Sequence, residues 1–270
     1  MIKKIFNHIR NFCYNRVAHN PELTRLLIHK NRDYVIDELF KYPSFINNGH
    51  LHFEKLFKIA EDYKLNNESG IILDVGGADG VTAVMFSKAF KNASVHVFEP
   101  LEDNIPQLKK NIQAHSRIKL FQMALGSENK QTKINITHRV TSSSLLNINT
   151  SELKDDYMSS QLAPEREQTI EVNTIDNLVA TSQKVLVLKM DVQGYELEVL
   201  KGAKNTLKNT CLVMAEFQNH KLYDGAPMYH DLDKFLLENN FTLMQFIPSL
   251  SEKHKQMEWD AIYINNSLIK

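Results

Sequence analysis

Cysteine is scarce in this sequence, which contains only two cysteines in 270 residues. Cys13 and Cys211 lie far apart, and neither has a cysteine or histidine neighbour at the spacing of a structural zinc site. The sequence therefore predicts no disulfide framework, and a reduced, cytoplasmic location fits best. The eleven histidines are scattered along the chain, so a divalent metal is conceivable but not favoured.

Glycine and proline are also few, and neither sign of charge is in excess. Nine glycines and seven prolines exclude a collagen-like or linker-dominated chain. Lys and Arg together number 32, as do Asp and Glu, so we expect no nucleic acid as the main partner. Hydrophobic residues make up 43% of the sequence, which is enough for a large buried core.

Long hydrophobic runs are absent, since no stretch approaches the ~20 residues of a membrane span. At the N-terminus His8, Arg10 and Asn11 interrupt the continuous apolar core that a signal peptide requires. Residues 1–30 hold six basic residues and one acid. This bias is compatible with peripheral membrane contact through a basic first helix, but a solvated basic face is the favoured interpretation.

The pattern of apolar residues changes near residue 66. Before it, apolar residues follow helical spacing, as in the set Phe53, Leu56, Phe57 and Ala60. After it, short β-branched runs alternate with helical patterns, which is typical of βαβ units and a mostly parallel sheet. We therefore predict an N-terminal helical extension over residues 1–65 and an α/β domain over residues 66–270.

The α/β domain contains seven predicted strands and four predicted helices. The strands are Ile71–Val75, Ser94–Phe98, Ile118–Met123, Val185–Met190, Cys211–Phe217, Phe241–Phe246 and Trp259–Ile264, and the last two could pair as a hairpin. The helices are Val81–Phe90, Asp103–Ala114, Tyr195–Leu207 and Tyr229–Glu238. A polar segment over residues 141–167 is predicted to be an irregular lid or substrate loop.

The most informative segment runs from Ile71 to Gly80, where an apolar strand leads into a glycine-rich turn and then a helix. Gly76, Gly77 and Gly80 bring backbone close to a ligand at the positive end of a helix. The next strand ends at Glu99, whose carboxylate could accept hydrogen bonds from a ribose diol. This arrangement predicts a nucleotide-cofactor site.

The charges in this segment favour one cofactor class over another. A nicotinamide dinucleotide carries a pyrophosphate, normally bound by G-x-G-x-x-G, and Asp74 and Asp79 would repel it. S-adenosylmethionine carries a sulfonium and an ammonium, both cationic, so an acidic loop favours it. Asp74, Gly76, Gly77, Gly80 and Glu99 are the predicted cofactor residues from this region.

At this point the sequence resembles the FkbM-type methyltransferases. The resemblance extends from about Ile71 to Glu216 and rests on an ordered set of motifs. They are Leu73-Asp74-Val75-Gly76 with Gly80, Phe98-Glu99-Pro100, Ala124-Leu125-Gly126, Ser143-Ser144-Leu145, Thr174-Ile175-Asp176, the stretch from Leu188 to Ala203, and Val213-Met214-Ala215-Glu216. The chain departs from the family pattern at Gln193, where the family often has Glu.

The resemblance implies a class I methyltransferase fold, which is Rossmann-like with a seven-stranded, mostly parallel sheet. It also implies S-adenosylmethionine as the cofactor and O-methylation of a carbohydrate or small-metabolite hydroxyl. In such an enzyme Pro100 and Leu101 would offer an apolar surface to the adenine, with further contacts near Ala124. The alternatives are a nicotinamide-dependent oxidoreductase and a non-catalytic binding or scaffolding module that retains the fold.

The acceptor side of the predicted site comes from the ends of later strands. Asp191 could act as general base or orient a hydroxyl, or it could cap the helix that begins near Gly194. Glu216 and His220 supply a second carboxylate and an imidazole at the next strand end. Three candidates remain. We expect Ser143 and Ser144 to contact the substrate or to form the lid. We expect Lys189 to pair with a neighbouring acid.

Overall fold

The computed structural model describes residues 51–149, 160, 162–218, 222–252 and 255–269. The chain divides into two compact units, Met1–Glu54 and Lys55–Lys270, and nearly all described residues belong to the second. The predicted extension therefore lies largely outside the described residues, as does the basic segment 1–30. The helical spacing predicted for Phe53 to Ala60, at the end of the extension, is confirmed, because Leu51–Asp62 forms helix α4.

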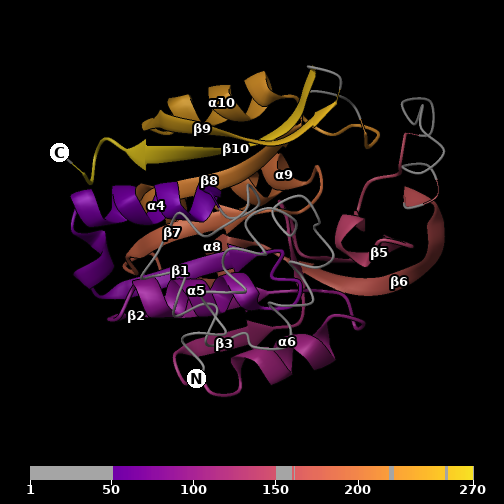
Figure 1. The fold of residues 1–270 in the computed structure, drawn as a ribbon, viewed down its shortest axis with the longest axis horizontal. Helices are drawn as coiled ribbons and strands as arrows, with labels where there is room; N and C mark the ends of the chain where they lie inside the picture. Colours follow the sequence, from indigo (N-terminus) through magenta and orange to yellow (C-terminus); the bar gives the residue numbers. More distant parts are fainter. Residues whose placement is uncertain (1–50, 150–159, 161, 219–221, 253–254, 270) are drawn as a thin grey trace, which may run out of the picture. The chain divides into compact units, whose positions relative to one another are not determined.

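The second unit is built on a seven-stranded sheet with the order β3-β2-β1-β7-β8-β10-β9 (Figure 1). Its strands are β1 (Gly70–Val75), β2 (Ala93–Phe98), β3 (Ile118–Phe121), β7 (Val185–Met190), β8 (Thr210–Gln218), β9 (Phe241–Glu252) and β10 (Lys255–Asn265). The pairs among β3, β2, β1, β7 and β8 are parallel, whereas β10 is antiparallel to both β8 and β9. The predicted mostly parallel, Rossmann-like sheet is confirmed, and so is the C-terminal hairpin.

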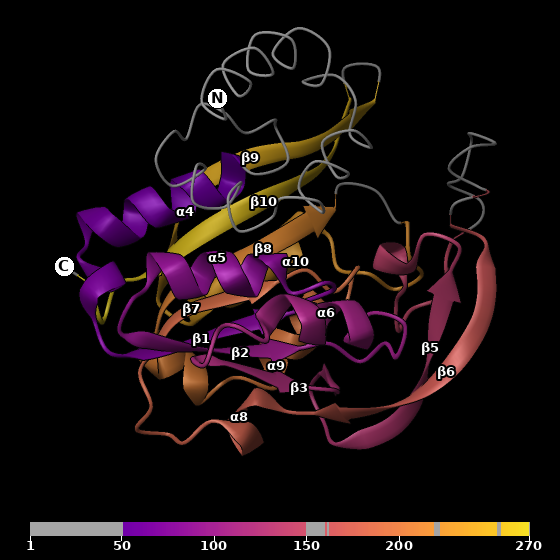
Figure 2. The same ribbon diagram turned by 60° about the horizontal axis from the view of Figure 1, so that its bottom comes forward.

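Helices cover both faces of this sheet (Figure 2). They are α5 (Val81–Ala89), α6 (Ile105–Ile112), α8 (Ile175–Leu178), α9 (Glu196–Lys201) and α10 (Tyr229–Glu238). Helix α5 packs on β1, β2 and β3, and its Phe86 and Phe90 rings contact Phe57 of α4. The opposite face buries Leu73 and Leu188 against α8, α9 and α10. Because side chains alternate along a strand, every second strand residue faces α5.

The sequence did not predict a second, three-stranded sheet, which has the order β4-β6-β5 and is called the small sheet below. It consists of β4 (Ala124–Leu125), β5 (Lys130–Thr137) and β6 (Pro164–Asn173). Its own core is small and includes Ile134, Ile136, Ile170 and Val172. The other side chains of β5 and β6 are mostly polar and exposed, so the strands read as loop in the sequence.

The small sheet corrects the predicted irregular segment 141–167 at its end, because residues 164–167 belong to β6. The segment begins with a short 3-10 helix, η4 (Val140–Ser142). Hydrogen bonding to β5 orders the C-terminal residues, with Glu167 paired to Asn135. Residues 150–159 of this segment lie outside the described residues.

Three of the quoted motifs meet away from the predicted site. A Cβ at Gly202 would lie 1.9 Å from the Gly126 oxygen, so these two segments pack backbone against backbone. The Asp176 carboxylate accepts hydrogen bonds from the N–H groups of Asn205 and Thr206. This packing ends α9 at Lys201, six residues earlier than the predicted end at Leu207. The motifs therefore fix a junction of the fold.

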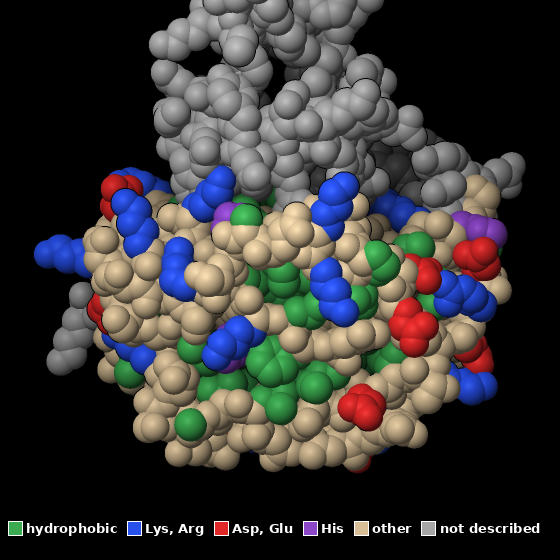
Figure 3. Space-filling model, turned by 90° about the horizontal axis from the view of Figure 1, so that it is seen from below, with side chains coloured by type: hydrophobic (Ala, Val, Ile, Leu, Met, Phe, Trp, Pro, Cys, Tyr) green, Lys and Arg blue, Asp and Glu red, His purple; other side chains and the backbone are tan. Residues whose placement is uncertain are grey.

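The described helices and the described surface are in line with the lack of long hydrophobic runs and of an excess of one charge in the sequence. Among the described residues no helix is long and apolar enough to cross a membrane. On the described part of the face in Figure 3, Lys and Arg side chains are spread over the surface, and some of them lie beside Asp or Glu side chains.

Candidate functional site

The predicted cofactor and catalytic residues gather at the carboxyl edge of the sheet. The glycine loop follows β1, Glu99 follows β2, Asp191 follows β7, and Glu216 lies near the end of β8. Because these four strands are parallel neighbours, their ends lie side by side. In open α/β sheets this edge is where ligands bind.

The glycine loop after β1 has a shape that only small residues allow. Gly76 has a φ of 77°, and a Cβ there would lie 1.9 Å from the backbone oxygen of Asp191. A Cβ at Gly77 would lie 2.2 Å from Val97. Gly80 has a φ of 79° and forms the N-cap of α5. The loop is therefore pressed between the ends of β2 and β7.

Backbone N–H groups of this loop are largely used within the chain. Gly76 and Gly77 both donate to the Phe98 oxygen, and Gly80 donates to Gly77. Ala78 donates to a Glu99 carboxylate oxygen. A pyrophosphate depends on such N–H groups for binding. Their use inside the chain, next to a buried carboxylate, weighs against the dinucleotide alternative.

Glu99 is only 4% exposed and joins the loop to the end of β2. Its Oε2 accepts from the Ala78 N–H at 2.8 Å, and its Oε1 accepts from Leu101 N–H at 2.9 Å and from Asn104 Nδ2 at 3.1 Å. Burial raises the pKa of Glu99, and these hydrogen bonds oppose the shift. A carboxylate has about four acceptor sites, so Oε2 retains capacity for a ligand hydroxyl.

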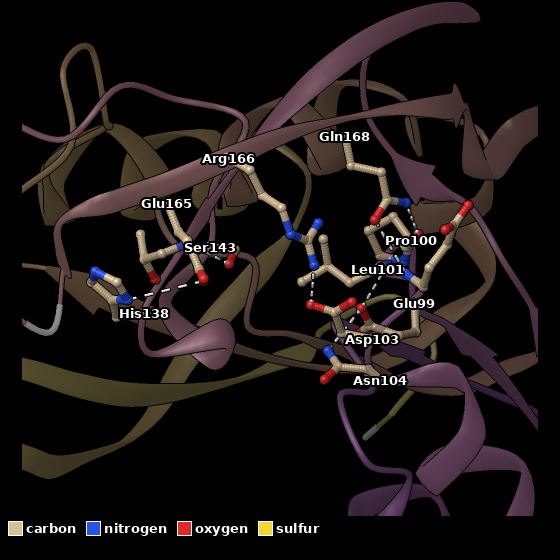
Figure 4. A network of polar contacts seen from close by, with 12 residues as sticks. Glu99, Pro100, Leu101, Asp103, Asn104, His138, Ser143, Glu165, Arg166 and Gln168 are labelled. Carbon is tan, nitrogen blue, oxygen red and sulfur yellow. Dashed lines mark hydrogen bonds and ion pairs between the residues drawn. The ribbon is translucent and has the colours of Figure 1, made fainter.

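The segment after Glu99 is held by the small sheet, as Figure 4 shows. Gln168 of β6 donates to the Pro100 oxygen at 3.1 Å and accepts from the Glu102 N–H at 3.3 Å. Arg166 of the same strand forms an ion pair with Asp103. The Leu101 side chain is buried in the core of the small sheet. The small sheet thus positions the predicted cofactor segment.

Two of the predicted adenine contacts therefore have other neighbours. Leu101 packs with the small core, as does Ala124, the first residue of β4. Pro100 is only partly buried and keeps some of its ring accessible.

Asp74 and Lys189 form a buried ion pair beneath the glycine loop. Their nearest atoms, Nζ and Oδ1, are 3.3 Å apart, and Lys189 Nζ also donates to the Gly76 oxygen at 3.0 Å. Burial raises the pKa of Asp74, and the Lys189 ammonium opposes this. Burial lowers the pKa of Lys189, but the carboxylates of Asp74 and Asp191 outweigh it and leave the pKa raised. The predicted pairing of Lys189 is confirmed, and Asp74 supports the loop through it.

Asp191 and Glu216 are brought together by the side chain of Gln193. The Gln193 amide nitrogen donates to Asp191 Oδ1 at 2.9 Å and to Glu216 Oε2 at 3.1 Å. Its carbonyl oxygen accepts from the Tyr223 hydroxyl at 2.9 Å. Asp191 and Glu216, joined in this way, are called the acid pair below. The pair could orient a hydroxyl and accept its proton.

The backbone of Gln193 is held in an unusual conformation, with a φ of 54°. Ser144 Oγ donates to the Gln193 oxygen at 2.7 Å and so fixes this turn. The preceding residue, Ser143, has a different partner, because its Oγ accepts from the Thr137 N–H at 3.3 Å. A non-glycine residue at positive φ persists only where its surroundings hold it, and such residues cluster at functional sites.

Two glutamates at this edge, Glu216 and Glu196, have raised pKa values. Burial raises the pKa of Glu216 well above its usual range, and the nearby carboxylates of Asp191 and Glu258 add to the shift. Burial also raises the pKa of Glu196 to about 7. Carboxyl groups with perturbed pKa values are frequent at catalytic sites.

The structure tests the helix-capping interpretation of Asp191. The N-cap of α9 is Tyr195, with no side-chain cap hydrogen bond. Glu196 takes over the neighbouring N–H groups, accepting from Val192 at 2.9 Å and from Gly194 at 3.4 Å. The helix-capping alternative for Asp191 is therefore wrong, and its carboxylate stays available to a ligand.

Two site predictions remain open. His220 lies outside the described residues, so its place relative to the acid pair is a prediction still. Within the described part of the chain, no group of three or more His, Cys, Asp or Glu could hold a metal ion.

Sequence reasoning missed three contributors to this site: Tyr223, Gln168 and Arg166. Tyr223 is 30 residues from Gln193. Gln168 and Arg166 lie in a strand that had not been recognised. The alternation of Ile170 and Val172 with polar residues was the signal that could have revealed this strand.

Comparison with known proteins identifies relatives over most of the chain. The methyltransferase FkbM domain matches residues 74–243. The 2-O-methyltransferase NoeI of Sinorhizobium fredii is 24% identical over 210 residues, which cover 76% of this chain and 83% of the relative. The hexuronic acid methyltransferase AglP of Haloferax volcanii is 29% identical over 193 residues, or 65% of this chain and 70% of the relative.

Among solved structures, a methyltransferase FkbM from Methylobacillus flagellatus KT is similar with a TM-score of 0.48. It is 16% identical, and the match covers 73% of this chain and 43% of that one.

Proposed function

The chain belongs to the methyltransferase FkbM family, and on this premise we propose that it transfers a methyl group from S-adenosylmethionine to a hydroxyl of a carbohydrate or another small metabolite. The names of two relatives, a 2-O-methyltransferase and a hexuronic acid methyltransferase, support this acceptor class. The observation that carries the proposal is the closed glycine loop with Glu99 beside the acid pair, on one edge of one sheet.

The loop residues fit a cationic cofactor. S-adenosylmethionine supplies an electrophilic methyl group on a sulfonium, and it carries an ammonium group as well. Asp79 and Glu99 give this edge of the sheet a negative potential that attracts both cations. Glu99 would bind the ribose through the free capacity of Oε2, and Pro100 would border the adenine.

Asp191 is the residue that we assign to the acceptor hydroxyl. Its carboxylate is 44% exposed, so a ligand can reach it, and Gln193 fixes the direction of Oδ1. The raised pKa of Glu216 favours its protonated form, which leaves Asp191 to take the proton as the hydroxyl oxygen is methylated. Orientation of the hydroxyl toward the methyl group is the larger part of this role.

The test is a transfer assay with S-adenosylmethionine labelled in its methyl group. The acceptors are p-nitrophenyl hexosides, the corresponding glucuronide and a catechol. We expect label in a product that survives mild base, because methyl ethers resist base whereas methyl esters release methanol. Binding of the cofactor without transfer to any acceptor would instead support a binding module.

The Asp191→Asn variant gives this assay its residue-level control. We expect turnover to fall on the order of 100-fold, because a positioned base contributes at least that much. The affinity for S-adenosylhomocysteine should stay within about twofold, since that product leaves the acceptor position empty. Asp224→Asn removes an exposed carboxylate near Tyr223 and should leave turnover unchanged. Normal turnover of the Asp191 variant removes this residue from catalysis.

A further inference from the structure

Gln218, the last residue of β8, has a buried side chain with unmet hydrogen-bonding capacity. The residue is 5% exposed. Neither its amide nitrogen nor its amide oxygen has a hydrogen-bond partner in the described part of the chain. Buried polar groups without partners are rare in folded proteins, and each one calls for an explanation such as a ligand.

The position of Gln218 relates it to the acid pair. Glu216 precedes it by two residues in the same strand, so both side chains lie on the same face of the sheet. Across the antiparallel ladder, Gln218 faces Glu258 and Glu216 faces Asp260. Gln218 therefore lies just beyond the acid pair at the carboxyl edge, where an acceptor must approach Asp191.

Asp74 is a second buried polar group without a hydrogen bond, but its charge is compensated. Asp74 has no hydrogen-bond donor in bonding geometry, but the Lys189 ammonium lies 3.3 Å away. The amide of Gln218 is uncharged, so no ion pair can compensate for its missing hydrogen bonds. Its donor and its acceptor need specific partners, and the two point in different directions from one carbon atom.

We propose that Gln218 binds the methyl acceptor and that this acceptor is a neutral, hydroxyl-rich molecule of the hexose class. An amide carries an acceptor oxygen and a donor nitrogen on one carbon atom, and this pair can bind two neighbouring hydroxyls of a sugar ring. One hydroxyl donates to Oε1 while the next accepts from Nε2. This inference rests on the proposed function: Gln218 recognises the acceptor, and Asp191 acts on the hydroxyl that is methylated.

The charges around Gln218 favour a neutral acceptor over an acidic one. Burial raises the pKa of Glu216 and of Glu258, and the nearby Asp191 carboxylate adds to both shifts, so negative charge is already crowded at this edge. Lys189 is occupied by Asp74, and Arg139 acts on Glu258. A uronic acid would add a further carboxylate to this group at an energetic cost.

The Gln218→Met variant separates a binding amide from a structural one. Methionine keeps the length of the side chain and removes its polar atoms, so the protein should unfold at the same or a higher temperature. The KM for the neutral hexoside with the highest wild-type rate should rise roughly tenfold, because two hydrogen bonds to the acceptor are lost. The affinity for S-adenosylhomocysteine should not change.

The probes are the p-nitrophenyl glycosides of glucose, galactose, mannose, fucose and rhamnose, together with the glucuronide. Gln113→Met, which removes an exposed amide at the end of α6, is the matched control and should leave KM unchanged. Rescue by Gln218→Asn is not expected, because its amide is one methylene short of the acceptor.

Several outcomes would overturn the inference while leaving the proposed function intact. They are an unchanged KM for Gln218→Met, a clear loss of stability in that variant, preference of the wild-type protein for the glucuronide, or methylation of the catechol or the glucuronide but of none of the neutral glycosides. Failure of the wild-type protein to bind S-adenosylhomocysteine would instead overturn the proposed function itself.

Discussion

The two halves of the candidate site are held together by different kinds of contact. At the ends of β1 and β2, the Glu99 carboxylate accepts from backbone N–H groups of Ala78 and Leu101. At the ends of β7 and β8, Gln193 joins two acid side chains and a tyrosine hydroxyl. The first half therefore depends on the path of the backbone, whereas the second depends on which side chains are present.

This difference suggests a division of labour. A backbone-built half suits a cofactor that never varies, because its geometry tolerates few substitutions. A half built from side chains can change its acceptor by exchanging one residue without disturbing the loop. Gly76 is the point where the halves touch, because its Cα faces the backbone oxygen of Asp191.

The largest effect should come from Gly76→Ala, which breaks both halves at once. The added Cβ would lie 1.9 Å from the Asp191 oxygen, and the φ of 77° is unfavourable for alanine. We expect a loss of unfolding free energy of more than about 4 kcal/mol, measured by denaturant titration. Gly225→Ala is the matched control, since its φ is 78° but its Cβ would meet nothing within 4 Å. Equal losses in the two variants would show that the contact with Asp191 is unimportant.

The half of the site at the ends of β7 and β8, called the acceptor half below, should make the unfolding free energy depend on pH. The folded pKa of Glu196 is about 7, above its ordinary value of 4.5, so the folded state binds this proton more tightly. Its contribution to stability is present below pH 4.5 and is lost as the pH rises to about 7, by an amount on the order of 3 kcal/mol. The Glu196→Gln variant should lack this part of the decline in unfolding free energy.

Glu198 provides the control for this pH profile. Its pKa is lowered because, although partial burial acts to raise it, hydrogen bonds from Lys201 and Ser127 outweigh that effect. Glu198→Gln should therefore leave the decline between pH 4.5 and 7 in place. A profile for Glu196→Gln that matches the wild-type protein would contradict the buried, protonated carboxyl.

A smaller effect, confined to the cofactor half, is expected for Glu99→Ala. The variant loses three hydrogen bonds that order the loop and the proposed contact with the ribose. The Kd for S-adenosylmethionine, measured by calorimetry, should rise roughly 30-fold. Glu102→Ala, which removes an exposed carboxylate from the same segment, should bind normally. Unchanged affinity for the Glu99 variant would refute the ribose assignment.

The smallest effect is expected for a residue outside both halves, Gln168 of the small sheet. Gln168→Leu removes two hydrogen bonds from the small sheet to the Pro100–Glu102 segment. The Kd for the cofactor should rise about fivefold while turnover at saturating cofactor stays near normal. Lys133→Ala breaks an exposed ion pair with Glu167 on the same sheet and should change neither quantity. Gln168 does not position the loop if its variant behaves like the Lys133 variant.

The sequence predicted those parts of the two halves that depend on local patterns, and it missed those that depend on contacts between distant residues. The strand β7 was predicted at its observed bounds because Val185–Met190 is a continuous buried run. Asp191 and Glu216 were expected on one side of the site because they lie at the carboxyl ends of successive predicted strands. The bridge through Gln193 depends on a turn at positive φ, and its Tyr223 partner arrives from a distant loop. Neither leaves a local pattern in the sequence.

The small sheet was missed for a different reason, which is its composition. Its strands bury few apolar residues and expose charged ones such as Lys133 and Glu167, so composition alone suggested a loop. Conversely, Gly126 and Gly202 lie in conspicuous motifs yet serve to pack two backbone segments together. Motifs located the fold and the edge of the site, whereas the division between structural and ligand-binding residues required the three-dimensional arrangement.

The central claim is that the glycine loop binds a sulfonium cofactor beside an acid pair that serves the acceptor. Calorimetric titration of the purified protein with S-adenosylmethionine, S-adenosylhomocysteine and NAD tests it most directly. We predict saturable binding of both sulfur compounds at one site per chain and no binding of NAD. Binding of NAD, or no binding of either sulfur compound to folded protein, would contradict the account.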